Sequence, residues 1–140
     1  MFGELDADWS SPLFLVEGVF DMIALDNAVP LLGSTLSSRS RLLRTLSDRS
    51  TPTLVAVDVD GMTATHPTLG ATSRTHVVRA LAVVERLIAA DVPSFLVPMS
   101  GKDPSSVGAA AMVAAAAGAT RIRGRADLLR VRTEFMRVLS

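Results

Sequence analysis

The stretch Leu13-Phe-Leu-Val-Glu-Gly-Val-Phe-Asp21 decides the fold of this 140-residue chain. Its first four residues form a continuous apolar run, which is typical of a strand covered on both faces, as in a parallel sheet. Glu17 then stands at the carboxyl end of that strand, where open α/β sheets bind their ligands. Gly18 allows a sharp turn without Cβ strain, and Asp21 falls in the first turn of a helix expected over residues 20–26. The stretch therefore predicts a buried strand with two carboxylates at its tip.

The rest of the chain alternates apolar runs with amphipathic helical patterns. Further strands are expected at 28–32, 53–58 and 94–98, with a short edge strand at 120–123, and further helices at 38–48, 75–90, 107–117 and 126–139. This alternation predicts an α/β fold: a Rossmann-like central sheet, four-stranded and mostly parallel, flanked by helices. Residues 61–73 are rich in turn formers and hydroxyls, and we expect them to form a loop at the ligand-binding edge.

The helix expected over 75–90 has the clearest apolar face. Val77, Leu81 and Val84 recur at helical spacing, so they are predicted to face the core. Arg79 falls outside that stripe and is predicted to face solvent.

Composition favours a single folded domain. The chain is 49% hydrophobic, which excludes a disordered protein, and it has no cysteine, which excludes disulfides and thiol chemistry. No apolar run approaches the roughly 18 residues of a membrane span, and the acidic start lacks the basic region of a signal peptide. A cytoplasmic protein that does not enter the membrane is therefore expected.

Charge is balanced overall but unevenly distributed. Residues 1–38 hold six acids and no Lys or Arg, whereas residues 121–140 hold six Arg against two acids. A basic segment of this kind favours contact with nucleic acid and a solvated basic helix about equally, so charge alone leaves both open.

Polar residues follow four of the expected strands at the same edge of the sheet. They are Glu17 and Asp21 after the first strand, Gly33 and Ser34 after the second, Asp58 and Asp60 after the third, and Lys102 and Asp103 after the fourth. Carboxylates brought together in one cleft repel unless a cation lies between them. Hard oxygen ligands suit Mg²⁺ or Mn²⁺, and such metals beside a basic residue are typical of phosphodiester chemistry.

These motifs together resemble the Toprim domain, in the version found in bacterial-type primases. The resemblance covers residues 13–106 and is carried by Glu17-Gly18, the Gly33-Ser-Thr turn, Asp58-Val-Asp60 and Lys102-Asp-Pro104. It implies a Toprim core at 13–106, preceded by an N-terminal arm at 1–12 and followed by a C-terminal helical extension at 107–140.

The resemblance also implies roles for individual residues. Glu17 would be the catalytic acid or base and a metal-linked carboxylate, with Asp58 and Asp60 as metal ligands. Asp21 and Asp103 would be further ligands, direct or through water, and phosphate would be bound by Lys102, Gly18, Gly33 and Ser34. Simpler roles stay open for three of these residues: a helix N-terminal acid for Asp21, a turn residue for Asp103 and a solvated loop cation for Lys102.

Three functions remain open. The first is the catalytic module of a primase, in which Mg²⁺ or Mn²⁺ supports the synthesis of RNA primers from nucleotides on a single-stranded DNA template. Residues 62–73 exceed the short turn of that family, and no zinc-binding module precedes the core, so a second protein is expected to supply the template-binding and zinc-binding domains. The alternatives are a stand-alone Toprim nuclease and a non-catalytic adaptor that uses the Arg-rich segment at 121–137.

Overall fold

Short strands alternate with longer helices in the computed structural model, which describes residues 7–18, 25–31, 41–59, 64–66, 70–99 and 103–139. The elements, in chain order, are β1 (Leu13–Val16), β2 (Ala28–Pro30), α2 (Arg41–Arg49), β3 (Thr53–Val55), β4 (Ala64–His66), β5 (Gly70–Thr72), α3 (Arg74–Ala89), β6 (Ser94–Leu96), α4 (Pro104–Val107), α5 (Ala109–Ala117), β7 (Thr120–Ile122) and α6 (Arg125–Leu139). Most of the predicted helix at 20–26 lies outside the described residues.

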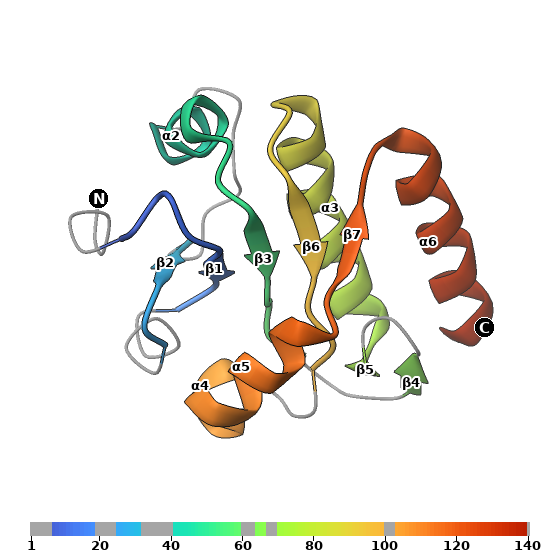
Figure 1. The fold of residues 1–140 in the computed structure, drawn as a ribbon. Helices are drawn as coiled ribbons and strands as arrows, with labels where there is room; N and C mark the ends of the chain where they lie inside the picture. Colours follow the sequence, from blue (N-terminus) through green and yellow to red (C-terminus); the bar gives the residue numbers. More distant parts are fainter. Residues whose placement is uncertain are drawn as a thin grey trace.

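Five of the strands form one sheet in the order β2-β1-β3-β6-β7 (Figure 1). The first four are parallel, and β7 joins the edge antiparallel to β6. At the centre, Leu15 of β1 pairs with Val29 on one side and Val55 on the other. The mostly parallel α/β sheet predicted from the sequence is therefore confirmed, and so is the edge strand near residue 120.

The apolar run in β1 is buried on both faces of the sheet because strand side chains alternate. Leu13 and Leu15 join the core beneath α2, α3 and α6, whereas Phe14 and Val16 join the core beneath α5 and Leu25. Figure 1 shows α3 passing behind the sheet while α5 lies on the near side. The elements on each face of the sheet thus cover one of the two hydrophobic cores.

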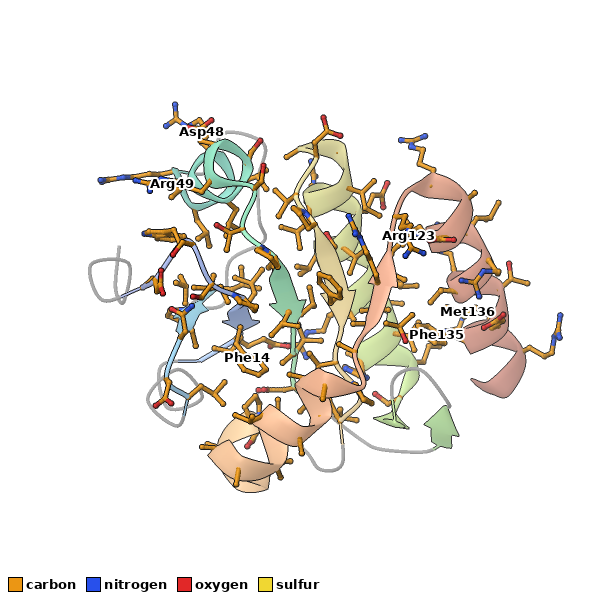
Figure 2. The ribbon with its side chains drawn as sticks, in the orientation of Figure 1. Phe14, Asp48, Arg49, Arg123, Phe135 and Met136 are labelled. Atoms are coloured by element: carbon orange, nitrogen blue, oxygen red, sulfur yellow. The ribbon has the colours of Figure 1, made fainter. Side chains whose placement is uncertain are left out.

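The last helix, α6, packs against α3 and belongs to the larger of the two cores. Its Leu128, Val131 and Phe135 are buried there. Figure 2 shows Phe135 on the side of α6 that faces the sheet. The boundary predicted at residue 106 stays a prediction, while β7 and α6 share the sheet and the core with earlier elements.

Two short strands lie within the segment 61–73, which was predicted to be a loop. It contains β4 and β5, which pair as an antiparallel hairpin, so the prediction of a plain loop was wrong for these strands. Gly70 has a φ of 68° and forms an isolated bridge with Met99. A Cβ at this position would collide with the Met99 carbonyl oxygen, so only glycine fits where the hairpin meets the chain beyond β6.

The helix predicted at 107–117 is present as α5, which begins two residues later, at Ala109, and is preceded by the short helix α4. Gly108 has a φ of 94° and separates α4 from α5, because a backbone in this region cannot continue a right-handed helix. None of the helices in the described ranges is both long enough and apolar enough to span a bilayer.

Candidate functional site

The tips of β1 and β3 lie side by side at the point where the chain changes direction across the sheet. Leu25, which follows β1, packs on one face, and α3, the helix that follows β3, packs on the other. Between such strands the crossing connections diverge and leave an opening at the carboxyl edge, which is where open α/β sheets bind ligands. The side chains that follow β1 and β3 are therefore the first candidates for a functional site.

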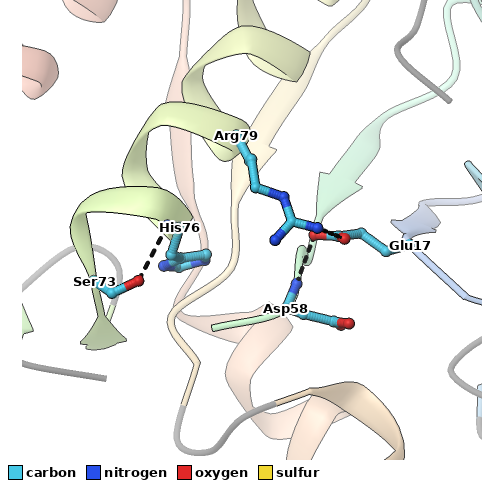
Figure 3. Close-up of polar contacts among 5 residues, drawn as sticks. All are labelled: Glu17, Asp58, Ser73, His76 and Arg79. Atoms are coloured by element: carbon cyan, nitrogen blue, oxygen red, sulfur yellow. Dashed lines mark hydrogen bonds and ion pairs between the residues drawn. The ribbon is translucent and has the colours of Figure 1, made fainter. Parts of the chain in front are cut away.

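Glu17 occupies the tip of β1 and is held from two directions. Its Oε1 accepts a hydrogen bond of 3.0 Å from the backbone N–H of Asp58, and its Oε2 forms an ion pair with the guanidinium of Arg79 (Figure 3). Only 16% of the Glu17 side chain is exposed. A carboxylate so shielded from water needs such partners, because an ionised group loses its hydration when it is buried.

Asp58 follows β3 and is held in place by the sheet. The N–H of Ala56 still bonds the Leu15 carbonyl at 3.1 Å, so the chain keeps its pairing with β1 beyond the end of β3. Val57 and Val59 are buried on either side of Asp58. The Asp58 main chain is therefore a fixed donor to Glu17, and its Oδ1 is shielded from solvent.

Arg79 was predicted to face solvent, and it does so only in part, because its guanidinium also contacts Glu17. Its guanidinium reaches Glu17 across 62 residues of sequence, and 39% of its side chain is exposed. The helix that carries it starts at the carboxyl edge of the sheet, where Ser73 Oγ caps the N–H of His76 at 3.2 Å. His76 and Ala80 of the same helix are both buried, so Arg79 lies at the border between the buried and exposed faces of α3.

The remaining predicted site residues divide into two groups. Gly18 follows Glu17 directly in the described chain. Asp103 precedes α4, where its carboxylate accepts a hydrogen bond of 3.1 Å from Ser105 and its carbonyl accepts one from the N–H of Val107, an arrangement that suits a turn residue. Outside the described residues lie Asp21, Gly33, Ser34, Asp60 and Lys102.

The carboxylates of Glu17 and Asp58 are oxygen donors of the kind that Mg²⁺ or Mn²⁺ prefers. Within the described ranges, no three His, Asp or Glu side chains gather as a metal site. Mg²⁺, however, is commonly held by one or two carboxylates while water and substrate phosphates complete the shell. Glu17 and Asp58 supply two such carboxylates at adjacent strand tips, and each carboxylate oxygen can accept more than one bond.

A separate cavity of about 250 Å³ lies between α2 and α3. Its lining residues are Leu43, Arg44, Ser47, Arg86, Ala89 and Ala90. These residues sit at the far end of α3 from Arg79 and include no carboxylate, so this cavity is distinct from the site at the strand tips.

The fold and the strand-tip residues define a Rossmann-like α/β domain whose switch point carries two carboxylates and an arginine. Comparison with solved structures finds a similar fold in the primase of Aquifex aeolicus, in a crystal structure of its zinc-binding and RNA polymerase domains. The TM-score is 0.56 with 18% sequence identity, over 79% of this chain and 26% of the primase chain. The match thus spans about a quarter of that primase chain. No family model and no curated protein matches the sequence.

Proposed function

We propose that this chain is a Toprim-type catalytic module that performs metal-dependent nucleotidyl transfer in primer synthesis. The observation that carries the proposal is the hydrogen bond between Glu17 and the Asp58 backbone, which joins two acidic strand tips at the switch point of the sheet. The fold likeness to a primase supports the same assignment. The order of the Glu-Gly, Asp-x-Asp and Lys-Asp-Pro motifs along the sequence adds to it.

The proposed metal shell is built from Glu17 and Asp58, with Asp60 added from the sequence pattern. A bound Mg²⁺ or Mn²⁺ supplies charge neutralisation for phosphate oxygens in such sites. In nucleotidyl transfer, a primer hydroxyl oxygen bonds to the α-phosphorus of a nucleoside triphosphate, pyrophosphate leaves, and the hydroxyl proton passes to water. The Asp58 N–H and Arg79 both favour the ionised form of Glu17. Glu17 is therefore better suited to holding the cation than to keeping a proton.

In this proposal, these 140 residues do not supply the zinc-binding and template-binding domains of such an enzyme. The matched region is a quarter of a primase chain that also carries a zinc-binding domain. A zinc-binding and template-binding module would come from another segment or a second polypeptide. The substrates would be nucleoside triphosphates and a single-stranded DNA template.

The ion pairs of two arginines in α6 weaken the alternative in which the chain is a non-catalytic nucleic-acid adaptor. Arg130 lies within ion-pair distance of both Asp127 and Glu134, and Arg132 within ion-pair distance of Glu85. These acids offset part of the positive charge that α6 carries in the sequence. The strand-tip site therefore ranks above the basic helix as the functional feature.

The test is incorporation of labelled nucleotides on a single-stranded template with Mn²⁺, run beside a plasmid-nicking assay. The variants are Glu17→Gln, Asp58→Asn and, as a matched control, Asp48→Asn on the exposed surface of α2. The chain is assayed alone and with a separate zinc-binding primase module. We expect incorporation that disappears in the first two variants and persists in the control.

Two outcomes would replace the proposal. Nicking without incorporation, lost in Glu17→Gln, would identify a nuclease that uses the same acids. DNA binding that ignores Mn²⁺ and survives both site variants, with no turnover in either assay, would identify an adaptor.

A further inference from the structure

We propose that Arg79 is a displaceable counter-ion: it neutralises Glu17 before a divalent cation binds and then turns its guanidinium to a substrate phosphate. This inference rests on the metal-binding role of Glu17 in the proposed function. It assigns to Arg79 a positioning role and a phosphate-binding role that the sequence pattern did not indicate.

The first observation is that Glu17 is already neutralised by the protein itself. One oxygen faces the Asp58 N–H and the other faces Arg79. Since the Glu17 side chain is only 16% exposed, water alone would solvate its charge poorly. The ion pair thus keeps the carboxylate ionised and in place before any cation arrives.

The second observation is that the two partners of Glu17 differ in how easily they can leave. The Asp58 N–H is part of a main chain fixed by the bond between Ala56 and Leu15. Arg79 is a long side chain, 39% exposed, on the border of α3. Its guanidinium can rotate into solvent without moving the backbone, whereas the Asp58 N–H cannot withdraw unless the sheet is deformed.

Charge repulsion then determines which of the two contacts with Glu17 is lost when a cation binds. A divalent cation bound to Glu17 and the Arg79 guanidinium would both be positively charged and would contact the same carboxylate. Like charges a few ångströms apart repel each other. The Oε1 contact is unaffected, because an N–H dipole and a metal can share a carboxylate. Binding of the cation therefore favours departure of Arg79 from Oε2.

Once released, the guanidinium suits a second task at the same place. Arginine presents a planar fork of donors that matches phosphate oxygens in a bidentate manner. The substrate of the proposed reaction brings phosphates to the cation held by Glu17. One exchange would therefore couple cation binding to phosphate binding, so that each strengthens the other.

The test measures binding rather than turnover. Mn²⁺ is titrated calorimetrically into the wild-type chain, Arg79→Gln, and Arg86→Gln as a matched control on the same helix, far from Glu17. Removal of the competing cation should tighten Mn²⁺ binding by about tenfold, within the usual range of coupling between two sites. The control should match the wild type.

A second titration uses a non-hydrolysable nucleoside triphosphate with Mn²⁺ present. Arg79→Gln should bind this analogue about tenfold more weakly than the wild type, a loss expected for one charged phosphate contact. Arg79→Lys keeps the competing charge and lacks the planar fork, so its Mn²⁺ affinity should match the wild type while its affinity for the analogue falls.

The outcomes separate this inference from the proposed function. If the wild type binds no Mn²⁺, the metal site itself is refuted. If it binds Mn²⁺ and Arg79→Gln binds it equally or more weakly, only the exchange is refuted. If Arg79→Gln fails to fold, Arg79→Lys decides: unchanged affinity for the analogue would overturn the phosphate role.

Discussion

The backbone N–H of Asp58 donates a hydrogen bond of 3.0 Å to Oε1 of Glu17, which lies 41 residues earlier in the chain. No local turn creates this contact. It exists because β1 and β3 are parallel neighbours whose carboxyl ends meet at one edge. The position of the Glu17 carboxylate is therefore set by the register of the sheet, and the candidate site depends on correct strand pairing.

Substitutions at Glu17 should separate its hydrogen bond from its charge. In Glu17→Gln the amide oxygen can still accept from Asp58, and only the partly exposed pair with Arg79 is lost, so the free energy of unfolding should fall by less than about 1 kcal/mol. In Glu17→Ala the Asp58 N–H loses this acceptor, which should cost about 1–3 kcal/mol. Urea unfolding measures both values, and equal losses would contradict the hydrogen-bond argument.

Replacement of Gly70 should loosen the hairpin. Gly70→Ala places a Cβ in a left-handed backbone, at roughly 1–2 kcal/mol, and forces it against the Met99 carbonyl. We expect a total loss above about 2 kcal/mol and faster amide exchange at residues 70–72. Gly124→Ala, which has open space around its Cβ, is the control and should change stability little. Normal exchange at 70–72 in Gly70→Ala would disprove the bridge to Met99.

The C-terminal helix should contribute strongly to the stability of the whole fold. Phe135 is 1% exposed in the larger core, so Phe135→Ala should lower the free energy of unfolding by about 3–5 kcal/mol. Leu129→Ala on the same helix is the control, because Leu129 is 63% exposed and its loss should stay within about 0.5 kcal/mol.

A fragment ending at residue 106 should not fold, because it lacks β7 and α6, which share the sheet and the larger core with earlier elements. A cooperative melt from that fragment would show that 13–106 is a complete core.

The hydrogen bonds that Asp8 accepts from Ser10 and Ser11 should depend on pH. The Ser10 hydroxyl, followed by the Ser11 hydroxyl and the Ser10 N–H, lowers the pKa of the exposed Asp8 carboxyl. A lowered pKa means that the stabilisation is present above the unfolded-state pKa of Asp8 and is lost as pH falls through the folded-state value. The amide shift of Ser10 should therefore titrate with a midpoint below the ordinary aspartate value, and Asp8→Asn should abolish the transition. A midpoint at or above that ordinary value would contradict the turn.

Local patterns in the sequence predicted much of this fold. The apolar run in β1 indicated burial on both faces, and Leu13 and Phe14 do lie in different cores. Helical spacing correctly predicted that Val77 and Leu81 of α3 face the core. The meeting of Glu17 with Asp58 followed from the parallel order of their strands. These predictions succeeded because side-chain periodicity and strand direction decide them.

The features that the sequence left unpredicted depend on distant contacts. Arg79 lies outside the apolar stripe of its helix, and only the placement of β1 beside β3 brings Glu17 within its reach. The hairpin formed by β4 and β5 is anchored by the bridge between Gly70 and Met99. The break at Gly108 reflects a backbone angle that composition did not reveal. In each case the deciding partner is set by how the chain packs.

The bridge between Gly70 and Met99 has a mechanical consequence. Met99 comes shortly before Lys102 in the sequence, and Gly70 opens the strand that runs through Ser73 into α3, the helix that carries Arg79. A displacement of the backbone at Met99 would therefore move Gly70 and, through β5, the first turn of α3.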